Sequence, residues 1–418
     1  MDDRSVLDLQ PSGNMTSFAM GSPGPATLKG CQDIMIRSTT LALKDPKHET
    51  NIFQYGPVQG DPTFRQELAA FLSKEYGDKV ESESLLVTAG ATNGLHLTVS
   101  TLFGHDVPIF VEDPTFFLAF KILKNDLGKT IIPAPTNEDG LDLIQLEEVF
   151  KENRKRAGDK TTWKCPFWTM LYTMTVFKNP TGMSSSQEQC RALIDLARKY
   201  DVLLFTDDVY NMFPYGKGSY PPRLLTYDKS ETPQYTGCVL SNGTFSKIFA
   251  PGIRLGWIEG HKPLVNMLAS CFSFQSITAG SFNHYTSLVM SAAIQLDLLS
   301  THLNHIRGIY KTRMGLMCDA LQKYLPNGCT FKRPEGGFFV WVTMPKEVDA
   351  SILQASANKK YHVDFVDGEK TSVTRGYKNS IRLSISYNDT HQIEQGVQNL
   401  AKAIQTYMNS LKEATLLP

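Results

Sequence analysis

Several polar residues of this chain directly follow apolar runs, where their side chains could meet at one edge of a sheet. Asp207 ends the run V-L-L-F-T, and Tyr210 lies three residues further on. Asn179 follows T-M-L-Y-T-M-T-V-F-K, and Lys247 and Arg254 come after C-V-L-S-N. Ligands of open α/β sheets bind at the carboxyl ends of the strands. We therefore expect a carboxylate, a phenol, an amide, an amine and a guanidinium to converge on one site.

This set of groups suits pyridoxal phosphate (PLP). The aldehyde of that cofactor needs a lysine amine for a Schiff base. A carboxylate keeps the pyridine nitrogen protonated, so that the ring can take up the electrons left when an amino acid loses its Cα proton. A phenol and an amide can hydrogen-bond the ring oxygen O3′. The phosphate favours a hydroxyl, a guanidinium and a helix N-terminus, and G-A-T-N-G at 90–94 would open such a helix.

The apolar runs themselves predict a large, mostly parallel β-sheet. They are continuously apolar rather than alternating, which is typical of strands buried on both faces. Helical patterns separate several of them, and in the clearest, 185–200, Ser185 and Glu188 predict a capping box at the N-terminus. The runs lie at 84–90, 107–114, 129–135, 169–176, 202–207, 238–241 and 253–259. We therefore predict an α/β domain built on a seven-stranded sheet.

The rest of the chain predicts a smaller α+β domain and an N-terminal arm. Before the sheet, one short helical pattern stands out, at about 30–43. After about residue 262 we expect a long helical stretch at 281–324, strands at 336–342 and 380–386, and helices near 350–360 and 390–411. The predicted domains are residues 1–50, an arm that packs with the small domain; 51–280, the large PLP-binding domain; and 281–418, the small C-terminal domain.

Composition and charge exclude several classes of protein. The 418 residues include 42 Lys and Arg and 42 Asp and Glu, so we expect no nucleic-acid or anionic-membrane partner. Seven scattered cysteines form no C-x-x-C pair, and no run approaches the roughly 18 apolar residues of a membrane span. With no apolar N-terminal segment, we expect a cytoplasmic protein.

His302 and His305 have metal-like spacing but no acidic or cysteine neighbour, so we expect an exposed helix face and no metal.

Three ordered motifs together resemble the class I/II aminotransferases of PLP fold type I. They are N-P-T-G at 179–182, D-x-x-Y at 207–210 and G-T-F-S-K-x-x-x-P-G-x-R-x-G at 243–256. The resemblance extends from about residue 21 to about residue 400. The run L-Y-T-M-T-V-F-K-N-P-T-G is similar to the branch that contains 2-aminoadipate, kynurenine and aromatic aminotransferases. It implies an enzyme that moves an amino group between an L-amino acid and a 2-oxo acid by a ping-pong mechanism.

The resemblance also implies roles for the matching residues. Lys247 would form the Schiff base and then move the proton between Cα and C4′. Asp207 would pair with the pyridinium nitrogen. Asn179 and Tyr210 would hold O3′, and Asn179 would also contact the substrate. The phosphate would be bound by Ala91, Thr92, Thr244, Ser246 and Arg254.

Four further residues match the family less directly. Phe116, in E-D-P-T-F, matches the aromatic that stacks on the cofactor, where the family usually has Tyr or Trp. Arg382 matches the arginine that binds the substrate α-carboxylate in a bidentate way, although an internal Asp or Glu would also satisfy a buried guanidinium. Tyr55 matches a residue that reaches the neighbouring subunit's phosphate, which implies a homodimer with shared sites. Gly21 aligns with a mobile loop that covers the substrate.

Other functions remain open from the sequence. A PLP-dependent lyase or cyclase, such as a C–S lyase or a cyclopropane synthase, would use the same lysine and carboxylate. A PLP-binding regulator would carry an N-terminal winged-helix domain, whereas only about 80 residues without basic excess precede the first predicted strand here. A non-catalytic PLP-binding protein is disfavoured because every expected polar group is present. The motifs do not identify the amino acid that is used.

Overall fold

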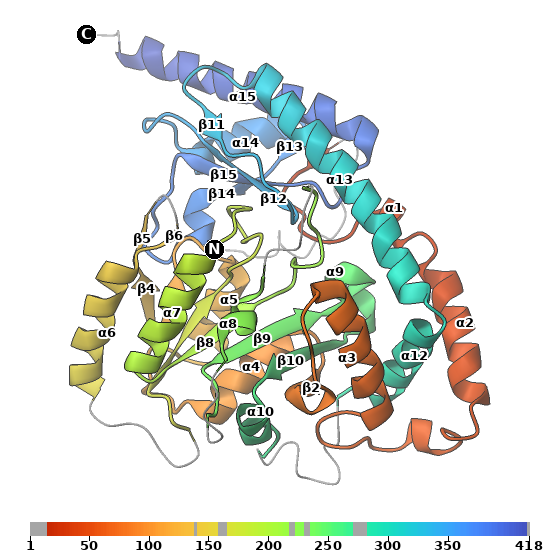
Figure 1. The fold of residues 1–418 in the computed structure, drawn as a ribbon. Helices are drawn as coiled ribbons and strands as arrows, with labels where there is room; N and C mark the ends of the chain where they lie inside the picture. Colours follow the sequence, from red (N-terminus) through yellow and green to blue (C-terminus); the bar gives the residue numbers. More distant parts are fainter. Residues whose placement is uncertain are drawn as a thin grey trace.

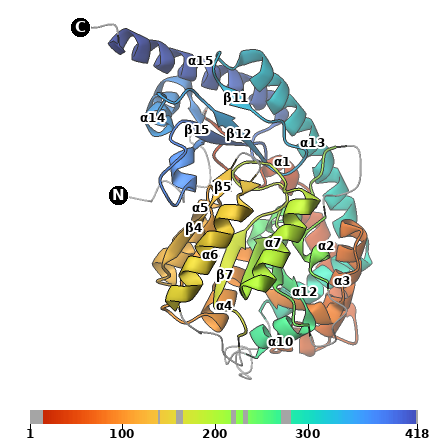
Figure 2. The same ribbon diagram turned by 60° about the vertical axis from the view of Figure 1, so that its left-hand side comes forward.

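The computed structural model describes residues 15–137, 140–157, 165–216, 222–229, 235–270 and 282–415. They form a large α/β part and a smaller α+β part above it (Figures 1 and 2). Among these residues, no helix is both long enough and apolar enough to cross a membrane.

A seven-stranded sheet forms the centre of the large part, as predicted. The strand order is β2-β10-β9-β8-β7-β3-β4, and β10 alone runs antiparallel to its neighbours. The strands are β2 (Leu85–Thr88), β3 (Ile109–Glu112), β4 (Ile131–Ala134), β7 (Thr169–Thr173), β8 (Val202–Asp207), β9 (Val239–Thr244) and β10 (Gly256–Gly260). All but β4 are buried along their whole length, because helices pack on both faces of the sheet.

Helices connect the strands of the large part, and the start of one of them differs by one residue from its predicted position. They are α3 (Pro62–Tyr76), α4 (Ala91–Leu102), α5 (Phe117–Lys121), α6 (Leu143–Ala157), α7 (Gln187–Lys199), α8 (Leu224–Tyr227) and α10 (Lys262–Ala269). The capping box of α7 joins Ser186 to Gln189, so the prediction of Ser185 and Glu188 is wrong by one residue. The backbone N–H of Ser185 bonds Thr175 O, which keeps Ser185 in the preceding loop.

The small part is an antiparallel sheet, ordered β11-β12-β15-β14, with helices on one side. Its elements are β11 (Thr330–Phe331), β12 (Phe339–Thr343), β14 (Val366–Asp367), β15 (Ser380–Ser384), α14 (Ala350–Tyr361) and α15 (Thr390–Thr415). The predicted strand at 336–342 begins later because Gly337 has a φ of 71°, which interrupts extended backbone.

The predicted helical stretch at 281–324 is two helices rather than one. α12 (His284–Gln295) packs against α2 (Cys31–Lys44) and α3, whereas α13 (Leu298–Tyr324) runs up to α15 (Figure 1). Asp297, at a φ of 53°, breaks the helical path between them. The expectation of an exposed His302 is also wrong: its ring is buried on α13, 5.4 Å from the Phe249 ring.

The N-terminal segment crosses the small part before it reaches α2. β1 (Thr16–Ser17) pairs in parallel with β13 (Val363–Asp364). The next residues follow β15: the Ser384 N–H bonds Phe18 O, and Ser386 Oγ donates to Met20 O at 3.1 Å and to Ser22 O at 2.9 Å. These bonds hold residues 18–22 across the carboxyl edge of the large sheet.

Candidate active site

Lys247 lies on α9 (Phe245–Ile248), a single turn that begins directly after β9. The Thr244 hydroxyl caps this turn by accepting the Ser246 N–H at 3.1 Å. Lys247 Nζ donates to Gly21 O at 2.8 Å and lies 6.0 Å from the centre of the Tyr210 ring. Burial and the nearby charge of Arg382 lower the pKa of Lys247 to about 8. Its amine therefore loses a proton far more readily than that of a surface lysine.

Asp207 ends β8 and is fixed by two neighbouring strands. Its carboxylate accepts hydrogen bonds from the Tyr172 hydroxyl and from Asn242 Nδ2, each at 2.8 Å. Burial raises the pKa of Asp207 to about 6, and these two hydrogen bonds act against that rise. The result is a buried carboxylate that is ionised at neutral pH and held in one orientation.

Arg382 on β15 brings the small part into the same site. Its guanidinium donates to Asn179 Oδ1 at 3.1 Å and to Ala19 O at 2.5 Å, and it lies 4.4 Å from the centre of the Phe339 ring. Burial lowers the pKa of Arg382 to about 10. Among the described residues, no carboxylate pairs with Arg382, and its Nε has no hydrogen-bonding partner. The internal Asp or Glu partner that the sequence allowed is therefore not found there.

Tyr210 lies near Lys247, Asn179 and Arg382. Its ring meets the Phe339 ring edge-on at 5.3 Å. Burial raises the pKa of Tyr210, whereas the charge of Arg382 and a hydrogen bond with Asn179 act in the opposite direction. The phenol thus stays protonated and adjoins both the amide and the guanidinium.

A second cluster surrounds the N-terminus of α4. Arg254 donates to Ala89 O at 3.3 Å and to Pro251 O at 3.0 Å, and it lies 3.5 Å from Ser246 Oγ. At Gly90, the residue before Ala91 and Thr92, a Cβ would lie 3.0 Å from the Arg254 guanidinium. The close approach of arginine, hydroxyls and open helix N–H groups makes a site for a phosphate.

The remaining predicted residues differ in how they meet this site. The Gly21 carbonyl is bonded to Lys247, and a side chain on Gly21 would press against Phe339 at 3.1 Å. Phe116 is half-buried just before α5, and its ring contacts Phe117 at 5.8 Å. Tyr55 is 60% exposed in the loop after η2 (Asn51–Phe53), where the structure gives its side chain no contact with the other predicted residues.

Sequence reasoning missed Tyr172, Asn242 and Ala19. Tyr172 lies inside an apolar run and Asn242 directly follows one, so both read as core residues, although Asn242 is directly opposite Asp207 in the sheet register. An amide inside an otherwise apolar strand was the available signal, because such a group needs a partner. Ala19 acts through its backbone carbonyl, which no side-chain pattern reveals.

Comparisons with known proteins agree with this geometry. The family model described as aminotransferase class I and II matches residues 28–400. Aromatic-amino-acid aminotransferase 1 of Thermococcus litoralis is 29% identical, covering 97% of this chain and 91% of that protein. The 2-aminoadipate transaminase of Thermus thermophilus is 26% identical, covering 96% and 93%. A crystal structure of a multiple substrate aminotransferase from Thermococcus profundus matches with a TM-score of 0.83 and 30% identity, covering 97% and 95%.

Proposed function

This chain belongs to the class I and II aminotransferases, and from that premise we propose which of its residues carry the reaction and which amino donors it accepts. It is a PLP-dependent enzyme that transfers an amino group between an amino acid and a 2-oxo acid. The observation that supports the residue assignment is the amine of Lys247, with its lowered pKa, beside the buried carboxylate of Asp207.

The side chains present fit PLP. A buried carboxylate suits a pyridinium nitrogen, and the cluster at the start of α4 suits a phosphate. The proposed cofactor contacts are Lys247, Asp207, Asn179, Tyr210, Phe116, Ala91, Thr92, Thr244, Ser246 and Arg254. When bound, PLP supplies an aldehyde that condenses with amines and a ring that accepts the electron pair released at Cα.

Each residue then has a definite task. Asp207, ionised above about pH 6, holds the proton of the ring nitrogen. Lys247 leaves Gly21 O, and its neutral amine accepts the Cα proton, which a pKa of about 8 permits near neutral pH. Arg382 and Asn179 bind the substrate α-carboxylate and orient it for that transfer. The carbonyl of Ala19, now on Arg382, is replaced by the carboxylate.

We propose aromatic amino acids and 2-aminoadipate as donors and 2-oxoglutarate or a similar oxo acid as acceptor. The names of the relatives support this range. The surroundings of Arg382 support the aromatic donors, because the rings of Phe339 and Tyr210 adjoin it. Both rings offer edges and faces on which an aromatic side chain can pack.

The active unit that we propose is a homodimer. Apolar side chains are exposed on α2, η2 and α12, which pack together: Ile36, Leu43, Phe53, Tyr285 and Leu296, the last just after α12. Phe53 stacks on Tyr285 at 6.1 Å. A second copy that covers this surface would let Tyr55, two residues from Phe53, reach the partner's phosphate, as the resemblance implies.

The proposal also includes the domain boundaries and the cellular location. Residues 1–50 form an arm of the small domain, 51–280 the large domain and 281–418 the small domain; the pairing of β1 with β13 supports the place of the arm. A cytoplasmic location is supported by the cysteines, since the six that the structure describes are free thiols.

The test is a spectral titration of the PLP-loaded protein with single L-amino acids and no oxo acid. Aromatic amino acids and 2-aminoadipate should convert the lysine-bound cofactor to the pyridoxamine form. The Lys247→Ala variant should lose at least about a thousandfold in rate, as expected when a general base is removed, whereas Lys402→Ala on exposed α15 should match the wild type. Release of ammonia without an acceptor would favour a lyase, and a complete lack of response to these donors would contradict the proposed range.

A further inference from the structure

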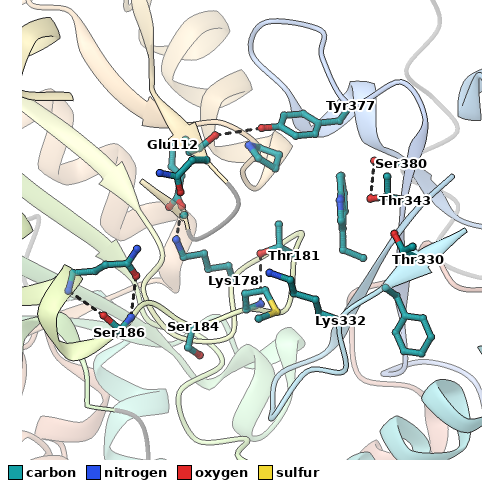
Figure 3. Close-up of a pocket in the computed structure, with 18 of the residues that line it drawn as sticks. Glu112, Lys178, Thr181, Ser184, Ser186, Thr330, Lys332, Thr343, Tyr377 and Ser380 are labelled. Atoms are coloured by element: carbon teal, nitrogen blue, oxygen red, sulfur yellow. Dashed lines mark hydrogen bonds and ion pairs between the residues drawn. The ribbon is translucent and has the colours of Figure 1, made fainter. Parts of the chain in front are cut away.

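A cavity of about 1050 Å³ lies between the large and small parts (Figure 3). One wall comes from the end of β3, the loop after β7 and the start of α7; the other comes from β11, β12 and residues 377–380. None of the predicted site residues is among the described residues that line it. Its volume is slightly above the roughly 300–1,000 Å³ typical of small-molecule sites.

The large-domain wall contains a buried cation with spare hydrogen-bonding capacity. Lys178 is 7% exposed, and its ammonium donates to Glu112 Oε1. Glu112 Oε2 accepts the hydroxyl of Thr173 at 2.7 Å. An ammonium has three donors, and within the described part of the chain the Lys178 ammonium hydrogen-bonds Glu112 alone. The other donors can bind an acceptor that enters the cavity.

A second lysine, Lys332, belongs to the small-domain wall of the cavity. Lys332 extends from the small domain toward Thr181 (Figure 3). It is exposed and forms no hydrogen bond or ion pair with the described residues. Lys178, Lys332 and Glu112 are the charged side chains among the described lining residues, and Glu112 is paired with Lys178. Each wall thus supplies an ammonium group that an anion in the cavity can contact.

An aromatic wall adjoins these charges. Trp341 on β12 lines the cavity and meets the Tyr377 ring edge-on at 6.0 Å. The Thr343 and Ser380 hydroxyls lie beside it, 3.4 Å apart. An indole at a half-buried wall can stack on a flat ring, while hydroxyls bind polar groups of the same ligand.

We propose that this cavity is a second small-molecule site, which takes an organic anion carrying an aromatic ring. The anionic group lies between Lys178 and Lys332, and the ring packs on Trp341. A nucleoside monophosphate has this chemistry and a suitable size. This site is separate from the catalytic centre and does not depend on the transamination reaction.

The site adjoins the residues that hold the substrate carboxylate. Lys178 directly precedes Asn179 in the chain, and Trp341 is opposite Arg382 in the register of β12 and β15. A ligand that joins both walls would thus shift the two groups that bind the α-carboxylate relative to each other. We expect it to change KM for the amino donor more than kcat.

Calorimetric titration of the PLP-loaded enzyme tests the proposal, since bound cofactor occupies the catalytic phosphate site. The probes are adenosine 5′-monophosphate, adenosine and ribose 5-phosphate. The monophosphate should bind at least about tenfold more tightly than either of the others. Lys332→Ala should weaken its binding by at least about fivefold and leave adenosine unchanged, whereas Trp341→Leu should weaken both. Lys402→Ala, a matched change of an exposed lysine, should alter neither.

Three results would overturn the proposal. One is the absence of binding of the monophosphate at millimolar concentration. Another is an affinity that Lys332→Ala leaves unchanged, because the lysine would then play no part. The third is full competition with the amino donor, in which the apparent Kd of the monophosphate rises without limit as the donor concentration increases, because that would assign the bound molecule to the catalytic centre.

Discussion

At the scale of single residues, burial shifts the pKa values of two charged groups of the candidate site toward neutral pH. Burial lowers the pKa of Lys247 to about 8 and raises that of Asp207 to about 6. Between these values the carboxylate is ionised while part of the amine is neutral, which is what proton removal from an amino acid requires. The hydrogen bonds on Asp207 set the lower limit of that range, since they oppose the effect of burial.

The Tyr172→Phe variant tests this role. The Tyr172 hydroxyl stabilises the ionised form of Asp207, so its loss raises the pKa of that carboxyl further. Protonated, inactive Asp207 then begins to accumulate at higher pH. We expect the acid limb of the kcat–pH profile to move upward by up to about one unit, while the alkaline limb stays in place.

A matched tyrosine provides the control for this change. Tyr200→Phe also removes a hydroxyl that donates to a carboxylate, Glu147, but Tyr200 is the C-cap residue of α7 just before the start of β8, whereas Asp207 ends that strand. Its profile should equal that of the wild type. An unchanged acid limb in Tyr172→Phe would show that this hydroxyl does not tune Asp207.

At the scale of elements, short turns after the strands orient the functional groups toward the candidate site. α9 has four residues and depends on the Thr244 cap, yet it turns Lys247 toward the arm. The loop between β7 and α7 carries Asn179 and ends at the capping box of Ser186 and Gln189. An N-cap side chain satisfies an N–H group that the helix leaves unpaired, so this box fixes where the loop ends.

Ser186→Ala should lower the free energy of unfolding by about 1 kcal/mol, the usual effect of removing a serine N-cap. The measurement is urea denaturation of the PLP-loaded protein followed by circular dichroism. Ser185→Ala, one residue earlier and outside the box, should change the midpoint little. Equal effects of the two substitutions would contradict the position of the cap in the structure.

At the scale of the whole molecule, the arm and the small domain close the site over the large sheet. Ala19 O accepts a hydrogen bond from Arg382, and Gly21 O accepts one from Lys247. Backbone carbonyls of the N-terminal segment thus bind both cationic groups in this structure. In the proposed mechanism the substrate displaces these carbonyls, so its binding requires movement of residues 18–22. On another side, the apolar surface of α2, η2 and α12 remains uncovered within one chain.

Phe53→Asp should therefore produce a monomer. Phe53 is 72% exposed, and a charge there would have to lose its hydration in the proposed dimer. Sedimentation velocity should show the monomer, and the rate of transamination should fall because Tyr55 no longer reaches a partner. Ile144→Asp is the matched control: Ile144 is 83% exposed on α6, away from this surface, and its variant should stay dimeric. A dimeric Phe53→Asp protein would exclude this surface as the interface.

The sequence by itself predicted the seven strands, which the structure confirms, and the groups that we propose as reactive. Continuous apolar runs predict buried parallel strands, and polar residues such as Asp207, Asn179 and Lys247 at the ends of those runs must share one edge of the sheet. Both inferences rest on local spacing, which the backbone geometry of a strand fixes.

Only the tertiary structure decided what these groups contact. The bond of Ala19 O to Arg382 joins residues 363 positions apart, and the cavity beside Trp341 exists only where two domains face each other. The break at Asp297 and the burial of His302 likewise depend on packing against distant elements. Such contacts are governed by free energies of burial and pairing between remote segments, which the order of residues along one segment does not specify.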